Sequence, residues 1–194
     1  DTEDALWRTM GPARTVNLAS GMLALSFLAL SRLSDLGAKP SLILSLQEEF
    51  HRTLLDMSSG QDADLSEDLS LKDYEQVAGA KSGSLFRLGC RTGAMIAGAA
   101  PDVVAQYGDY GYNLGIVAQM WNDLEGLSGL QGKGDAGQRR SLPILTTQAV
   151  EGMQPSTSPE EEQVGSLYTL VRLQIFHQRA TESLDLCPEE GRLG

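Results

Sequence analysis

One short stretch of the chain carries oxygen donors among apolar residues. The segment QMWNDLEGL, residues 119–127, places Gln119, Asn122 and Asp123 at positions i, i+3 and i+4. On an α-helix this spacing puts the three side chains on one face. Carboxylate and amide oxygens suit Mg²⁺, which is commonly completed by the phosphate oxygens of a substrate. This face therefore predicts a metal site for a phosphorylated ligand, although Asn122 and Asp123 alone would also suit a solvated helix face.

Two further groups of charged residues could complete such a site. The chain opens with DTED, which supplies Asp1 and Asp4 and is followed by Arg8. Four basic residues lie further along the chain: Lys81, Lys133, Arg139 and Arg140. Two acidic clusters facing one another across a cavity could hold a diphosphate through bridging metal ions, with basic groups neutralising the remaining charge. The alternative for DTED is an acidic helix start, which the helix dipole favours. The two neighbouring arginines could instead cap a surface loop.

The elements that position these residues are predicted to be helices. Helical periodicity dominates, and strand-like alternation is nearly absent. The predicted helices cover residues 15–36, 40–58, 71–99, 101–128, 141–151 and 160–186. The glycine-rich segment 126–140 is expected to be a mobile loop, and the proline-containing segment 151–163 a solvent loop. We expect a single all-α domain over residues 1–194, a helical bundle with polar groups directed toward a central site.

Composition limits the classes of protein that fit. The chain has 194 residues, 41% of them hydrophobic, which suffices for the core of one domain. Its net charge of -11 argues against a nucleic-acid-binding surface. Cys90 and Cys187 lack metal-ligand spacing and are too few for a disulfide framework, which favours reduced thiols and a cytoplasmic location. The longest apolar run, residues 22–30, is shorter than the roughly 20 residues of a membrane span, so no stable membrane insertion is expected.

Several segments, in order, resemble the motifs of one enzyme family. GQDADL (60–65) is similar to a GQ-x-x-D segment, and YEQVAGAKSGSLFRLGCRTGA (74–94) to a helix with a Y…K-T-G pattern, with Ser82 in the Thr position. YGYNLGIVAQMWNDLEGL (110–127) is similar to a helix with Q-x-x-D-D-x-x-D, and KGDAGQRRSLPIL (133–145) to a K…D…K-x-L-P segment. DTEDALWRTMGPA (1–13) is similar to the end of a first Asp-rich motif followed by R-R-G-x-P. The chain thus resembles the trans-isoprenyl diphosphate synthases, the polyprenyl synthetase family, over well over half of its length.

This resemblance implies an all-α, isoprenoid-synthase-type bundle around a deep central cavity, here expected to lack its N-terminal helices. It implies Mg²⁺ as cofactor, typically three ions with a diphosphate. It also implies a homodimer, or a hetero-oligomer with a related subunit. The implied reaction is the condensation of an allylic prenyl diphosphate with isopentenyl diphosphate. In it, metal ions take up the leaving diphosphate and a carbocation is attacked by a double bond.

The resemblance also assigns roles to residues of this chain. The expected metal ligands are Asp1, Asp4, Asn122 and Asp123. The residues expected to bind the diphosphate are Arg8, Lys81, Lys133, Arg139 and Arg140. The expected catalytic residues are Lys81, Gln119 and Asp123.

The second Asp-rich motif departs from the family pattern. Asn122 and Gly126 stand where the family has Asp, so the site loses two formal charges. Asn122-Asp123-Leu124 with Gly126 also resembles the opening of a metal motif of class I terpene cyclases, whose final Glu would fall at Leu130. A terpene cyclase and a non-catalytic subunit of a prenyl synthase therefore stay open beside prenyltransfer.

Overall fold

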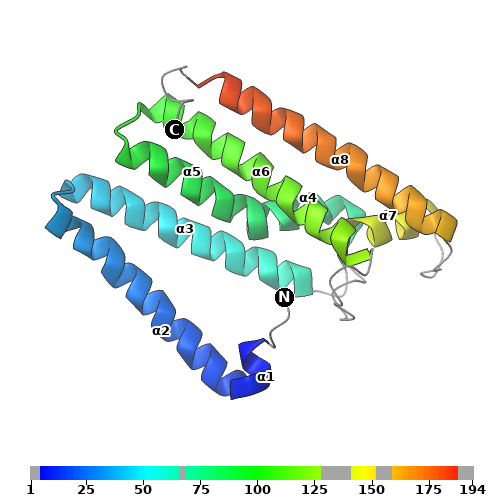
Figure 1. Cartoon of the computed structure of the whole chain (residues 1–194), viewed down its shortest axis with the longest axis horizontal. Helices are drawn as coiled ribbons and strands as arrows, with labels where there is room; N and C mark the ends of the chain where they lie inside the picture. Colours follow the sequence, from blue (N-terminus) through cyan, green and yellow to red (C-terminus); the bar gives the residue numbers. More distant parts are fainter. Residues whose placement is uncertain (1–4, 66–68, 128–140, 152–158, 188–194) are drawn as a thin grey trace. The chain divides into compact units, whose positions relative to one another are not determined.

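The computed structural model describes residues 5–65, 69–127, 141–151 and 159–187 (Figure 1). All regular secondary structure in these ranges is helical, which confirms the all-α prediction. The chain forms two compact units, residues 1–51 and 52–194. A single domain over residues 1–194 stays a prediction.

The first unit is built from helices, and glycines lie at two of the boundaries between them. Its elements are α1 (Leu6–Met10), α2 (Pro12–Ser31), the 3₁₀-helix η1 (Arg32–Leu36) and the first part of α3 (Pro40–Leu65). Gly11, with φ of 80°, ends α1, and Pro12 follows as the first residue of α2, a position that suits its fixed φ. Phe27 of α2 packs edge-on against Phe50 and stacks on His51 of α3, with ring centroids 5.5 Å and 4.8 Å apart. Aromatic contacts therefore join α2 to α3 within this unit.

The helical segment 12–36 is unusually apolar. Among the described residues it is the segment long and apolar enough to cross a membrane, with a mean hydropathy of 1.5. The prediction from sequence counted only the run 22–30 and missed this length, because polar residues such as Asn17, Ser20 and Ser31 lie just outside that run. Core helices of soluble proteins meet the same criterion, so this feature alone is weak evidence for a membrane span.

The second unit surrounds one long helix. Besides the end of α3, its elements are α4 (Leu71–Ala78), the π-helical turn η2 (Gly79–Gly83), α5 (Ser84–Ile96), α6 (Pro101–Leu127), α7 (Leu142–Glu151) and α8 (Pro159–Asp185). Helix α6 packs against η2 and α5 and also against α8, and α7 packs against α8 (Figure 1). The prediction of one helix over 71–99 is wrong in one respect, because η2 interrupts it. The predicted loops 126–140 and 151–163 lie mostly outside the described residues. In their described parts, residues 126–127 belong to α6 and residues 159–163 belong to α8.

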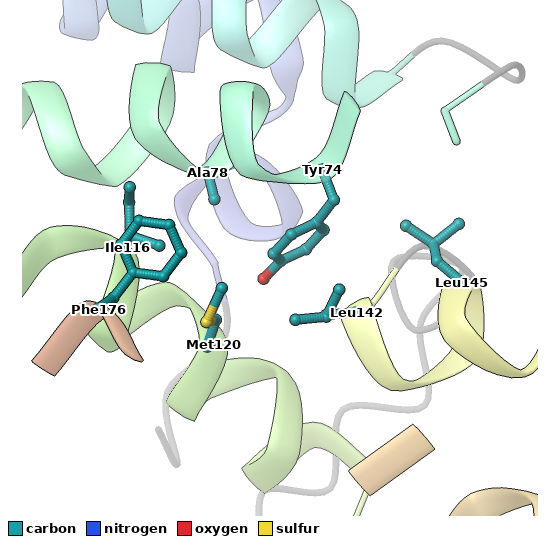
Figure 2. Close-up of a cluster of buried hydrophobic side chains, with 7 residues drawn as sticks. All are labelled: Tyr74, Ala78, Ile116, Met120, Leu142, Leu145 and Phe176. Carbon is teal, nitrogen blue, oxygen red and sulfur yellow. The ribbon is translucent and has the colours of Figure 1, made fainter. Parts of the chain in front are cut away.

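A cluster of buried side chains holds α4, α6, α7 and α8 together (Figure 2). Its members are Tyr74, Ala78, Ile116, Met120, Leu142, Leu145 and Phe176. Met120 is 0% exposed and Leu142 is 1% exposed. Figure 2 shows the Tyr74 ring among these apolar side chains, with its hydroxyl directed toward the α6 and α7 side. The Tyr74 hydroxyl is therefore a polar group within the apolar interface between α4, α6 and α7.

Glycines let α6 approach α5 and η2 closely. Gly111 and Gly115 lie one turn apart on the face of α6 that meets these elements. A Cβ at Gly111 would lie 2.6 Å from the Phe86 carbonyl oxygen, and one at Gly115 would lie 2.5 Å from the Ser82 carbonyl oxygen. Real Cβ atoms do not approach backbone so closely, so this packing requires glycine at both positions.

Candidate functional site

Lys81 lies on the π-helical turn η2. Such turns are rare and are found frequently at functional sites. Two glycines, Gly79 and Gly83, flank Lys81 and lie against Tyr112 of α6. A Cβ at Gly79 would overlap the Tyr112 hydroxyl, and one at Gly83 would lie 2.8 Å from a ring carbon. The glycines therefore admit the Tyr112 ring beside the turn that presents Lys81.

The Lys81 amine is paired with a carboxylate. Its Nζ donates to Oδ2 of Asp64, near the end of α3, at 2.6 Å. The Lys81 and Asp64 side chains are 23% and 32% exposed, so the pair is partly shielded from water. The assignment of site residues from sequence omitted Asp64. Its signal was present, because Asp64 matches the acid of the GQ-x-x-D pattern in the GQDADL segment.

Asp123 accepts hydrogen bonds from three groups, which lie on α4, on α7 and one turn earlier on its own helix, α6. Its Oδ2 accepts from the Tyr74 hydroxyl at 2.7 Å and from the Leu142 backbone N–H at 2.9 Å. Its Oδ1 accepts from Nε2 of Gln119, one turn earlier on α6, at 3.1 Å. The Gln119 Oε1 in turn accepts from the Ser82 hydroxyl of η2 at 2.9 Å. The carboxylate thus lies at the start of α7, where unpaired N–H groups and the helix dipole favour a negative charge.

The position of Asn122 differs from the prediction. Gln119 and Asp123 bond to one another on the inner side of α6, whereas Asn122 is exposed. The three side chains therefore do not form one uniform ligand face. Tyr74 was also missed in the assignment of site residues, because its partner Asp123 lies 49 residues away and no local pattern joins them.

Burial changes the acidity of both members of the Tyr74–Asp123 pair. Burial raises the pKa of Asp123, while hydrogen bonds from Leu142, Tyr74 and Gln119 act in the opposite direction. Burial raises the pKa of Tyr74 far above its ordinary range, and the negative charge and hydrogen bond of Asp123 raise it further. The phenol therefore keeps its proton as a donor to Asp123 throughout the physiological pH range.

This pair predicts a pH dependence of stability. An unfolded tyrosine loses its proton near pH 10, whereas folded Tyr74 retains it, so the contribution of Tyr74 is complete below that pH and declines above it. The free energy of unfolding should fall above pH 10, with a contribution from Tyr74 of up to about 1.4 kcal/mol per pH unit. Urea unfolding between about pH 9 and 11.5 should give a shallower decline for Tyr74→Phe than for the unchanged protein. Equal slopes would contradict this prediction.

The predicted residues meet at one small cavity. Its volume is about 210 Å³, and it is lined by Asp64, Tyr74, Val77, Ala78, Lys81, Gln119, Asp123 and Ser141. This volume is below the range typical of pockets for drug-sized ligands, roughly 300–1,000 Å³, and suits a compact polar group. The structure therefore brings together Lys81, Gln119 and Asp123, the three residues predicted to be catalytic.

Other predicted site residues are not placed at this cavity. Arg8 belongs to the first unit, where its guanidinium carbon lies 5.3 Å from the centroid of the Trp7 ring. Five predicted residues lie outside the described residues: Asp1, Asp4, Lys133, Arg139 and Arg140. Their proposed roles are therefore unchanged by the structure.

The described residues fit Mg²⁺ only in part. Carboxylate and amide oxygens have the right chemistry, because Mg²⁺ prefers oxygen ligands. However, no group of three or more His, Cys, Asp or Glu residues within the described ranges could hold a metal ion. Asp123 already accepts three hydrogen bonds, and Asp64 is paired with Lys81. This part of the chain therefore offers an exposed amide, Asn122, and no complete Mg²⁺ site.

The sequence of this chain matches a known protein family and a curated relative. The family model described as polyprenyl synthetase matches residues 3–164. A geranylgeranyl diphosphate synthase of Sulfolobus acidocaldarius is 31% identical over 96 residues, which cover 47% of this chain and 29% of that protein. The chain thus spans less than a third of this curated relative.

Solved structures share the fold. A polyprenyl synthetase from Streptomyces coelicolor A3(2) matches with a TM-score of 0.78 and 22% identity, covering 98% of this chain and 66% of that one. A geranylgeranyl pyrophosphate synthetase from the archaeon Geoglobus acetivorans matches with a TM-score of 0.82 and 20% identity, covering 97% of this chain and 65% of that one. The chain spans about two thirds of the length of these structures.

Proposed function

The chain belongs to the polyprenyl synthetase family, and from this premise we propose that it is a Mg²⁺-dependent trans-prenyltransferase. It would condense an allylic prenyl diphosphate with isopentenyl diphosphate. The observation that carries this proposal is the cavity at which Lys81, Gln119 and Asp123 meet, because these residues come from two separate family-like segments of the sequence. The proposed substrate class also agrees with the names of the related proteins.

In this proposal Lys81 binds the diphosphate of the allylic substrate. Its ammonium group is a compact charge with three donors, and charge-assisted hydrogen bonds to phosphate are among the stronger ones in proteins. Asp64 holds the amine at 2.6 Å, so the ligand would compete with Asp64 for it. The 2.9 Å hydrogen bond from Ser82 to Gln119 joins η2 to α6 beside the cavity.

The remaining site would be completed by residues from the rest of the chain. We assign metal binding to Asp1, Asp4, Asn122 and Asp123, and further diphosphate binding to Arg8, Lys133, Arg139 and Arg140. Bound Mg²⁺, in the proposed number of three ions, supplies the positive charge that stabilises the departing diphosphate. A homodimer or a hetero-oligomer with a related subunit, in the cytoplasm, completes the proposal.

A non-catalytic subunit of a prenyl synthase is the second candidate. The second Asp-rich motif retains one of its acids at Asp123, and that carboxylate accepts three hydrogen bonds from the protein itself. A motif that retains a single acid could preserve the fold of the family while lowering its catalytic activity. Such a subunit would bind an active relative.

Product analysis distinguishes the candidates. The full chain is incubated with Mg²⁺ and an allylic diphosphate, with and without isopentenyl diphosphate, and EDTA serves as the control. Prenyltransfer gives longer prenyl diphosphates only when both substrates and Mg²⁺ are present. Hydrocarbons or alcohols formed without isopentenyl diphosphate would instead indicate a terpene cyclase. An absence of turnover would overturn the proposal and favour the non-catalytic subunit.

A further inference from the structure

Helix α8 contacts the chain beside both of the groups that hold one oxygen of Asp123. We propose that Arg172 of α8 is a positioning residue of the candidate site. Together with Gly165 of the same helix, it keeps the Asp123 carboxylate in place. This inference rests on the proposed function, because the ligand whose binding it affects is a diphosphate with Mg²⁺. Both residues follow the part of the chain that matches the family model, so no family motif assigns them a role.

The first step concerns what holds the carboxylate. Oδ2 of Asp123 accepts from the Tyr74 hydroxyl of α4 at 2.7 Å and from the Leu142 N–H at the start of α7 at 2.9 Å. Oδ1 accepts from Gln119 of the same helix at 3.1 Å. A carboxylate oxygen has about two acceptor sites, so the bonds from the described residues leave one site on Oδ1. The direction of that site depends on where Tyr74 and Leu142 lie.

The second step is that Arg172 joins α8 to the residue that follows Tyr74 on α4. Its Nη2 donates to Oε1 of Glu75, and the two side chains are 23% and 37% exposed. The guanidinium carbon lies 5.6 Å from the centroid of the Phe176 ring, which belongs to the same buried cluster as Tyr74 (Figure 2). A planar guanidinium held by a carboxylate and an aromatic ring has a defined geometry. Arg172 therefore fixes α4 directly beside Tyr74.

The third step is that Gly165 lets α8 approach the residue that follows Leu142 on α7. A Cβ at Gly165 would overlap the Pro143 carbonyl oxygen and lie 2.8 Å from the carbonyl carbon. Real Cβ atoms do not come so close to backbone, so this contact requires glycine. Leu142 and Pro143 are themselves buried. Helix α8 therefore fixes the start of α7 directly beside the Leu142 N–H.

The two contacts lie on one face of one helix. A helix advances about 100° per residue, so Gly165 and Arg172, seven positions apart, point in directions that differ by about 20°. Thr169 lies between them and is 0% exposed. The single helix α8 thus sets the separation between α4 and the start of α7, and hence between the two donors to Oδ2. A change at Arg172 is therefore felt at Asp123, although Arg172 does not line the cavity.

Three substitutions on α8 test the role of the guanidinium. Arg172→Met removes the charge and keeps an apolar side chain of similar length. Arg172→Lys keeps the charge and a donor for Glu75 but loses the planar geometry. Arg179→Met is the matched control, because Arg179 is exposed and lies two turns further along α8. Its guanidinium carbon lies 4.9 Å from the centroid of the same Phe176 ring. The control thus removes an identical group from the same helix and the same ring.

Two NMR signals report the positions of the donors. The hydroxyl proton of Tyr74 is identified by its loss in Tyr74→Phe, and the Leu142 amide is followed by hydrogen exchange. Arg172→Met should shift or broaden the Tyr74 signal, Arg172→Lys should largely restore it, and Arg179→Met should leave it unchanged. Gly165→Ala should speed exchange at Leu142. An unchanged Tyr74 signal in Arg172→Met, or unchanged exchange in Gly165→Ala, would overturn the proposal.

Binding of inorganic diphosphate to the full chain, measured by calorimetry at a fixed Mg²⁺ concentration, reports the effect on the site. Arg172→Met should weaken binding about tenfold, as expected for a residue that acts through the hydrogen-bond partners of a ligand. Arg172→Lys should recover most of this loss, and Arg179→Met should cause none. In a Tyr74→Phe background Arg172→Met should have little further effect, because the hydroxyl through which it acts is absent. An equal loss in both backgrounds, with all variants folded, would indicate a general structural role and contradict the proposal.

A variant on the other side of the ion pair covers the case in which Arg172→Met does not fold. Glu75→Gln removes the charge of the partner and leaves α8 unchanged. The Tyr74 signal and the diphosphate affinity should change in the same direction as in Arg172→Met, to a smaller extent. An unchanged Tyr74 signal in folded Glu75→Gln would count against the positioning role.

The NMR signals also separate failure of this proposal from failure of the proposed function. If the unchanged chain does not bind diphosphate at all, the proposed function fails. A Tyr74 signal that responds to Arg172→Met and not to Arg179→Met would then still support the positioning role. Equal responses to both substitutions would overturn it.

Discussion

Replacement of Gly115 by Ala is expected to lower the free energy of unfolding by about 3 kcal/mol. The new Cβ would lie 2.5 Å from the Ser82 carbonyl oxygen and 2.7 Å from the Gly83 Cα. Both neighbours are backbone atoms, so neither can rotate away as a flexible side chain could. Helix α6 and the turn η2 must therefore move apart, which also disturbs the hydrogen bond between Ser82 and Gln119. Denaturant unfolding of the purified chain measures the effect.

Gly93→Ala is the matched control for this prediction. Gly93 lies within α5, and a Cβ there would meet nothing within 4 Å. The same substitution should raise the free energy of unfolding by about 0.4–1 kcal/mol, because alanine restricts the unfolded chain. The two variants should thus change stability in opposite directions. If both raised stability, the close approach of α6 to η2 would be wrong.

Local pattern in the sequence predicted some helices more accurately than others: it missed α1 and ended the helix from Pro40 at residue 58, whereas α3 continues to Leu65. Apolar periodicity placed the segments that became α6, α7 and α8 to within two residues at each end, and Pro101 starts α6 as expected. The π-helical turn η2 could not be predicted in this way. Its glycines Gly79 and Gly83 lie against Tyr112, a residue of α6. Periodicity within one segment carries no information about a partner from another helix.

The candidate site was predicted in part for the same reason. Helical geometry advances about 100° per residue, so Asp123 lies about 40° from Gln119 on one side and Asn122 about 60° on the other. This angular spread lets Gln119 and Asp123 line the cavity while Asn122 is exposed to solvent. Lys81 and Asp64 lie 17 residues apart in the sequence and on different elements. Their pairing therefore depends on the tertiary structure, which local pattern does not predict.

The substitution Lys81→Met is expected to weaken the binding of inorganic diphosphate by about 10- to 100-fold. A hydrogen bond to a charged group contributes about 1.5–3 kcal/mol, and each 1.4 kcal/mol corresponds to about tenfold in affinity. Methionine preserves most of the length and apolar volume of the side chain while removing the charge and all three donors. Calorimetry at a fixed Mg²⁺ concentration measures the loss.

Two variants show whether that loss is specific to the cavity. Lys72→Met makes the same change of charge at an exposed position of α4, and its affinity for diphosphate should stay within about twofold, because exposed charges are well screened. Asp64→Asn removes the carboxylate that holds the Lys81 amine at 2.6 Å. In the absence of Mg²⁺ it should therefore strengthen binding, by about fivefold if the competition is worth about 1 kcal/mol. If Lys72→Met weakened binding as much as Lys81→Met, diphosphate would be attracted by net charge alone. The cavity would then not be its site.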